Sequence, residues 1–277
     1  PKAMRESYGR ARRMAEELVR SRPGDNQAQG ALVDILVAAA TTARSERRIA
    51  DARADYLSAL PWLEQQEAKH PDHLVTQATL VTVYSGLGIC DSGEGRLREA
   101  REWHLRGIAR AEKVVRLSPD NVVYRRQLMF AYSHLGDVSG NPNLSNLGDA
   151  AGAYEAYGKM AGIAKGIFEA DRVDQRARSD YGIALMRMAL VTKDVEEKIR
   201  RLRESAELQE EVVRVNPANA AAFADLAVAR LFLGDALSEA GRAREAIGAY
   251  RESLRISEPR VGTGTPALLT AVMKGLQ

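Results

Sequence analysis

The chain repeats a pattern along its length: an aromatic residue, a small residue three positions later, and a proline twelve positions after that. The first three copies begin 48 residues apart and consist of Tyr8, Ala11 and Pro23; Tyr56, Ala59 and Pro71; and His104, Gly107 and Pro119. Repetition with a period of roughly 20 to 50 residues predicts a solenoid, in which each unit buries its apolar face by stacking on its neighbours.

Two further copies are less regular. The fourth has Tyr154 and Tyr157 with Glu169 in the place of the proline, and the fifth has Leu202, Ser205 and Pro217. We therefore expect one solenoid over 1–277, in which a half repeat at 1–22 precedes full repeats at 23–70, 71–118, 119–168, 169–216 and 217–258, and 259–277 caps the array with a short amphipathic helix at 266–274. Because the chain starts in the second half of a repeat and without a methionine, we expect a fragment of a longer polypeptide.

Each unit has the features of two helices. Asp or Asn follows most of the prolines, where its side chain can cap a new helix, as in Pro23-Gly24-Asp25. In the first helix, apolar or small residues recur at a spacing of four, as at Leu80, Tyr84 and Gly88, which places them on one buried face. In the second helix a large ring lies between two small residues. These positions are Ala52, Tyr56 and Ala59; Ala100, His104 and Gly107; Ala150, Tyr154 and Tyr157, where a tyrosine takes the place of the second small residue; and Ala246, Tyr250 and Ser253.

This pattern resembles the tetratricopeptide repeat, whose unit contains a leucine, a tyrosine, an alanine with a following aromatic, and a closing proline. Here Leu80, Tyr84, Ala52, Tyr56 and Pro71 match those positions. The units are longer than in the family by about seven residues in each helix, and an added heptad leaves the apolar face nearly in register. The resemblance implies an all-α, right-handed solenoid of about twelve helices, with an inner groove lined by the first helices.

Several other classes are disfavoured. The 40 basic and 37 acidic residues are interspersed, without the basic stripe that nucleic-acid binding requires. No segment has the roughly 20 apolar residues that cross a bilayer, and no motif for a metal, a nucleotide or another cofactor is present. We interpret the glycines of Gly86-Leu87-Gly88 and Gly93-Glu94-Gly95 as helix ends, His104 as a core residue, and Cys90 as a buried apolar residue without redox or metal function. A single cysteine favours a reducing compartment such as the bacterial cytoplasm.

The candidate partner-binding residues follow from the resemblance, which implies that groove positions recur at fixed distances after each proline. They are Asp34, Thr82, Arg126, Phe130, Ser133, His134, Arg176 and Asp180. Arg126 and Arg176 occupy equivalent positions of successive repeats, and two guanidinium groups beside Phe130 and His134 suit an acidic or C-terminal peptide. The alternative is an ordinary network of ion pairs on a solvated helix face.

The chain has no catalytic motif, so we expect it not to be an enzyme. The leading hypothesis is a scaffold or sensor module that binds a protein or peptide in its groove. A second hypothesis is a regulatory region of a bacterial Ser/Thr protein kinase, since Ala- and Arg-rich long repeats resemble segments that follow such catalytic domains. No H-R-D or D-F-G motif is present, so kinase activity would have to reside elsewhere. A third hypothesis is self-association into a homo-oligomer through an open repeat end.

Overall fold

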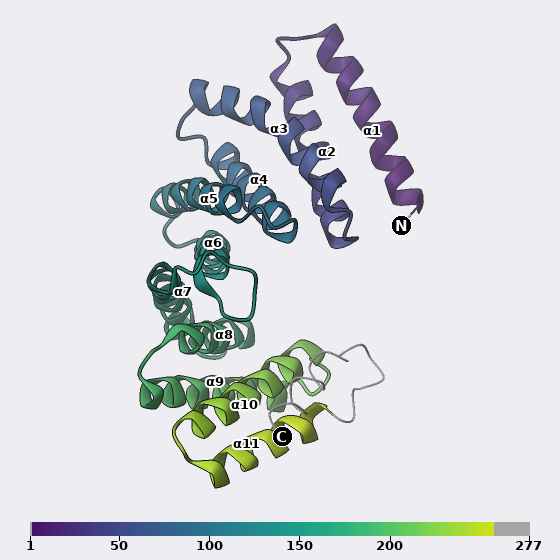
Figure 1. Ribbon diagram of the computed structural model, residues 1–277. Helices are drawn as coiled ribbons and strands as arrows, with labels where there is room; N and C mark the ends of the chain where they lie inside the picture. Colours follow the sequence, from purple (N-terminus) through teal and green to yellow (C-terminus); the bar gives the residue numbers. More distant parts are fainter. Residues whose placement is uncertain (1, 258–277) are drawn as a thin grey trace. The chain divides into compact units, whose positions relative to one another are not determined.

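The computed structural model describes residues 2–257, and every regular element in that range is an α-helix (Figure 1). The helices are α1 (Lys2–Ser21), α2 (Asn26–Ser45), α3 (Ile49–Lys69), α4 (Leu74–Gly93), α5 (Leu97–Leu117), α6 (Val122–Gly140), α7 (Ala150–Ala170), α8 (Gln175–Val191), α9 (Val195–Val215), α10 (Ala220–Glu239) and α11 (Ala243–Ser257). The predicted all-α helical repeat is confirmed. The twelfth helix, expected at 266–274, lies outside the described residues.

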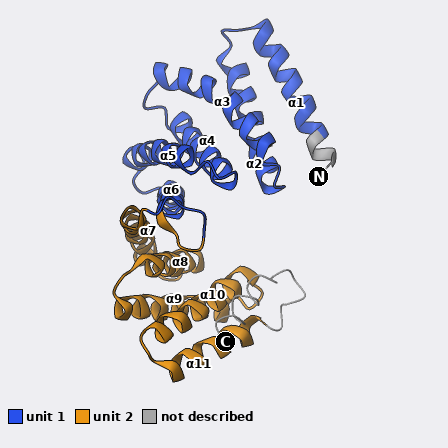
Figure 2. Cartoon of the chain, viewed as in Figure 1, with its two compact units in different colours: residues 1–139, 144–148 blue, residues 140–143, 149–277 orange. Residues whose placement is uncertain are grey.

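The chain divides into two compact units, coloured separately in Figure 2. Unit 1 contains residues 1–139 and 144–148, and unit 2 contains residues 140–143 and 149–277. Within unit 1, each helix from α1 to α4 packs on the next helix along the chain, and α2 also touches α4. In unit 2, each helix from α7 to α10 packs on the next helix along the chain, and α8 also touches α10. Contact between first helices of adjacent repeats is what stacked helix pairs require.

Short polar side chains start several of the helices, as their positions after the prolines predict. The Asp25 carboxylate accepts hydrogen bonds from the N–H groups of Gln27 and Ala28 at 2.9 and 3.1 Å and so caps α2. Asn121 and Asn219 cap α6 and α10 in the same way. At α4 the residue before the helix is His73, whose side chain does not cap the backbone. These bonds satisfy N–H groups that have no partner inside the helix.

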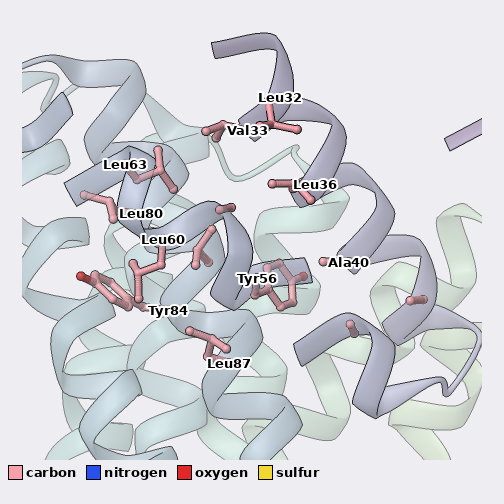
Figure 3. Packing of buried hydrophobic residues seen from close by; sticks show 14 of the residues in the cluster. Leu32, Val33, Leu36, Ala40, Tyr56, Leu60, Leu63, Leu80, Tyr84 and Leu87 are labelled. Carbon is pink, nitrogen blue, oxygen red and sulfur yellow. The ribbon is translucent and has the colours of Figure 1, made fainter. Parts of the chain in front are cut away.

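The core of unit 1 is built from the apolar stripes of α2, α3 and α4 (Figure 3). Leu32 and Leu36 of α2 point toward α3, which contributes Tyr56 and Leu63, and Leu80 of α4 closes the cluster. All five side chains are buried. Cys90 belongs to the same cluster and is fully buried, which confirms its predicted place, and burial raises the pKa of its thiol.

Glycines inside the first helices make room for the rings of the second helices. A Cβ atom at Gly86 would lie 2.3 Å from the Tyr56 ring, and one at Gly88 would lie 2.3 Å from the His104 ring. Both glycines are in the middle of α4, so their interpretation as helix-end residues was wrong. For Gly93 and Gly95 that interpretation is confirmed, because Gly93 ends α4 and Gly95 follows with a positive φ of 78°.

The register of the fourth repeat differs from the expected one. Tyr154, expected as the buried ring, is 40% exposed, whereas Tyr157 is fully buried. The Tyr157 hydroxyl accepts a hydrogen bond of 2.9 Å from the side chain of Asn141 in the loop before α7. The ring position is therefore shifted by three residues, since Ala153 and Tyr157 repeat the spacing of Ala52 and Tyr56. The longer loop before α7 displaces the ring position by three residues toward the C-terminus. Counting residues from the previous proline could not detect this displacement.

Candidate functional site

The first helices of unit 1 carry three adjoining hollows on the face that they share. The first, of about 480 Å³, lies between α2, the end of α3 and the start of α4. The second, of about 540 Å³, is lined by α1, α2, α4 and α6. The third, of about 240 Å³, lies further along α2, α4 and α6, and we call it the Arg44 pocket; its lining is Thr41, Arg44, Tyr56, Val81, Thr82, Ser85, Gly86, Ile89, Gln127, Phe130 and His134.

The hollows are continuous because neighbours share lining residues. Asp34, Val75 and Thr79 line both the first and the second hollow. Thr41, Thr82 and Gln127 line both the second hollow and the Arg44 pocket. We call the three together the first-helix trough.

Small side chains are the local reason for the trough. Glycine, alanine and threonine recur on this face, at Gly30, Ala38, Ala78, Thr79 and Thr82 among others, and they leave space that larger residues would fill. The threonine hydroxyls of Thr79 and Thr82 donate to carbonyls of their own helix, four residues back. Apolar groups are also exposed here, since Val75 is 63% and Phe130 is 40% exposed. Exposed apolar groups beside a hollow are typical of a protein-binding surface.

Four of the eight candidate groove residues line the trough. Asp34 lies in its first and second hollows, Thr82 in the second hollow and the Arg44 pocket, and Phe130 and His134 in the Arg44 pocket. The structure therefore brings together candidates from three successive repeats. Their role in binding stays a prediction.

The other four candidates lie elsewhere. Arg126 and Ser133 of α6 are buried, at 8% and 3% exposure. Arg176 and Asp180 belong to α8 of unit 2, where Arg176 is exposed and Asp180 is buried. Arg126 belongs to unit 1 and Arg176 to unit 2, so the trough, which lies in unit 1, does not include Arg176, and the pairing of these two arginines around one ligand stays a prediction.

Charge varies along the trough. The first hollow contains Lys69, His70 and His73 together with Asp34, and Asp34 also faces the second hollow. The Arg44 pocket has Arg44 and His134 but no acidic residue in its lining. His134 stacks on the buried ring of His104 with 5.5 Å between centroids, and its Nδ1 lies 4.0 Å from an Asp137 carboxylate oxygen.

Reasoning from the repeat pattern missed Arg44 and Gln127. Arg44 lies near the C-terminal end of α2, in the stretch by which this helix exceeds the usual repeat, so family positions did not include it. Gln127 is half-buried on α6, and its side chain faces both the second hollow and the Arg44 pocket. A signal was present for Arg44, since it is a lone charge in the otherwise uncharged run from Ile35 to Ser45.

A buried carboxylate anchors the helices beside this site. Asp91 of α4 accepts hydrogen bonds from Arg53 of α3 at 2.7 Å, from Arg96 at the start of α5, and from the Trp103 indole at 2.9 Å. Burial by itself would raise the pKa of Asp91, but the bonds from Arg53 and Arg96 outweigh it and the pKa is lowered. The charge is thus compensated, and Asp91 serves to join three helices.

The described part of the chain shows neither a metal-binding cluster nor a membrane-spanning helix. Residues 2–257 contain no group of three or more His, Cys, Asp or Glu side chains placed to hold a metal ion. In the same part of the chain, no helix combines enough length and apolar character to cross a membrane.

The chain is built of tandem helix pairs in which an aromatic ring of the second helix packs against a glycine of the first helix. This is a tetratricopeptide-like helical-repeat fold. Two of the solved structures that share it match nearly the whole chain. One is BtubC (BKLC) from P. vanneervenii, with a TM-score of 0.63 and 17% identity over 95% of this chain and 93% of that chain. The other is the apo form of RapI, with a TM-score of 0.60 and 9% identity over 97% of this chain and 64% of that chain. No protein-family model matches the chain, and no curated protein is significantly similar to it in sequence.

Proposed function

We propose that the chain is a protein-interaction module whose unit 1 binds an extended segment of a partner protein along the first-helix trough. The proposal rests mainly on one observation: the three hollows along α2, α4 and α6 are continuous, because adjacent hollows share lining residues. Helical-repeat proteins use surfaces of this kind to bind partners. Alternation of small residues, hydroxyls and exposed apolar groups suits a peptide better than a compact metabolite.

A blocking variant tests the proposal. Ala78 is a half-buried residue of α4 in the second hollow, so Ala78→Arg places a long side chain in the trough without removing a packing contact. Ala109 is exposed on α5 and lines none of the three hollows, and Ala109→Arg is the matched control. We expect wild type and Ala109→Arg to enrich the same sequences from a random dodecapeptide library, and Ala78→Arg to enrich none of them.

The result that would overturn the proposal is equal enrichment by wild type and Ala78→Arg, which would place binding on another surface. Circular dichroism and the melting temperature of both variants check that the added arginines leave the fold intact. No described feature favours the kinase-region hypothesis or self-association over peptide binding, and both stay predictions from the sequence.

A further inference from the structure

We infer that the Arg44 pocket receives an acidic side chain of the bound segment, with the Arg44 guanidinium as its charge partner and Gln127 as the acceptor for the segment's backbone. This inference rests on the proposed function, because it names the chemistry of one subsite of the trough.

Arg44 differs from comparable arginines of the described residues in having no anionic partner. Within the described residues, five arginines have an Nε atom that is buried and without a hydrogen-bond partner. Four of them, Arg110, Arg178, Arg201 and Arg230, also form an ion pair with a glutamate through another nitrogen. Arg44 forms no ion pair in the described part of the chain, and its pocket contains no acidic residue. A half-buried guanidinium without an anion is an incomplete pair.

The shape of the guanidinium group and its surroundings favour a carboxylate as the anion. Arginine presents planar N–H donors that match a carboxylate. Around Arg44 the pocket adds the half-buried hydroxyl of Ser85 and the ring of Phe130. These groups keep part of the bulk water away from the guanidinium, which strengthens its attraction for an anion.

Gln127 favours a peptide over a free anion as the occupant of the pocket. The Oε1 atom of Gln127 is buried and accepts no hydrogen bond. A turn of the Gln127 amide toward the trough would let this oxygen accept an N–H from the backbone of a bound segment, a donor that a free carboxylate or phosphate ion lacks. Because Gln127 faces both the second hollow and the Arg44 pocket, it stands where a segment lying in the trough would turn a side chain toward Arg44. An Asp or Glu residue of a peptide offers both groups at once.

The experiment uses the full chain and the dodecapeptide library. Wild type should enrich peptides with Asp or Glu at one fixed position, and Arg44→Met should lose that enrichment. Arg116→Met is the matched control, because Arg116 is exposed on α5 and outside the trough, and it should select as wild type does. The best peptide is then synthesised with Glu, Gln or phosphoserine at the enriched position, and its affinity is measured by fluorescence anisotropy.

For wild type we expect the Gln peptide to bind at least about tenfold more weakly than the Glu peptide, and for Arg44→Met we expect the two to bind alike. Gln127→Met should weaken the Glu and Gln peptides by the same factor, since it loses a backbone contact. Tighter binding of the phosphoserine peptide than of the Glu peptide would assign the pocket to phosphoryl groups and overturn the carboxylate assignment. Removing an uncompensated buried donor should leave the melting temperature of Arg44→Met unchanged or raised, so loss of binding cannot come from unfolding.

The two proposals fail differently. The inference is overturned if the enriched peptides have no fixed acidic position, or if Arg44→Met still selects the same acidic position. Either outcome would leave the proposal of trough binding intact. Failure of wild type to enrich any peptide would overturn both.

Discussion

At the scale of single residues, His104 occupies a ring position that tyrosine fills in other repeats. The hydroxyls of Tyr56 and Tyr250 each meet a polar residue fifteen positions earlier, Thr41 at 3.1 Å and Asp235 at 2.8 Å. For residue 104 the corresponding position is Ile89, which has no polar group. The His104 imidazole is buried, its Nδ1 has no hydrogen-bond partner, and burial, helped by the neighbouring His134, lowers its pKa to about 3.

We predict that His104→Phe removes a component of the acid sensitivity of this protein. With a folded-state pKa of about 3 against an ordinary value of 6.5, His104 stays neutral in the fold while the unfolded chain takes up a proton as the pH falls below 6.5. The free energy of unfolding therefore suffers no loss from His104 above pH 6.5. As the pH falls from 6.5 toward 3, protonation of His104 in the unfolded chain lowers it by roughly 1.4 kcal/mol per pH unit.

Chemical denaturation at pH 7 and pH 5 measures the effect. Between these two pH values wild type should lose about 2 kcal/mol more than His104→Phe, while groups that titrate in both proteins cancel in the comparison. Parallel stability curves for the two proteins would show that His104 is accessible to protons in the fold.

At the scale of elements, the turn from the first to the second helix of a repeat has one conformation in three repeats. Arg47, Gly95 and Gly241 have positive φ angles of 60°, 78° and 73°. The residue after each of them donates its N–H to the carbonyl five residues back, as from Arg96 to Asp91 at 2.9 Å. This is the geometry of a Schellman helix end, in which glycine is the favoured residue.

The arginine in this turn leads to a prediction: Arg47→Gly should stabilise the protein by about 0.5 to 1 kcal/mol. A residue with a Cβ atom is strained at positive φ, whereas glycine adopts it freely, and the extra flexibility of glycine in the unfolded chain offsets part of the gain. The matched control is Arg251→Gly at an exposed position inside α11, where glycine should cost about 1 kcal/mol. Thermal melts of both variants test the signs, and a lower melting temperature for Arg47→Gly would contradict the assigned turn.

At the scale of the whole molecule, helices α1 to α5 in unit 1 and α7 to α11 in unit 2 form two series of packed neighbours, so each series carries its own stabilising contacts. Unit 1 contains α1 to α5, α6 up to Ser139, and the complete trough. Residues 144–148 of the following loop also belong to it, since the Leu147 N–H donates to the Val138 carbonyl at 2.9 Å.

We predict that a fragment of residues 1–148 folds and selects the same peptides as the full chain. Its circular dichroism spectrum should be strongly helical, and it should unfold cooperatively, because the core of α2, α3 and α4 lies wholly within it. A helical fragment that selects no peptides, although the full chain does, would place the binding surface outside unit 1.

The sequence by itself determined the all-α repeat, most helix starts, and the burial of Cys90 and His104. These features depend on spacing along one helix and on the residues next to a turn, so they can be read locally. The sequence did not reveal that the ring position is Tyr157 and not Tyr154. A longer loop changes the number of residues between repeats but leaves the helical periodicity after the loop unchanged. Only the tertiary structure decided which polar residues of the first helices face the trough, and that Arg44 lies there without a carboxylate. Both depend on distances between helices that are far apart in the sequence, and no local pattern records those distances.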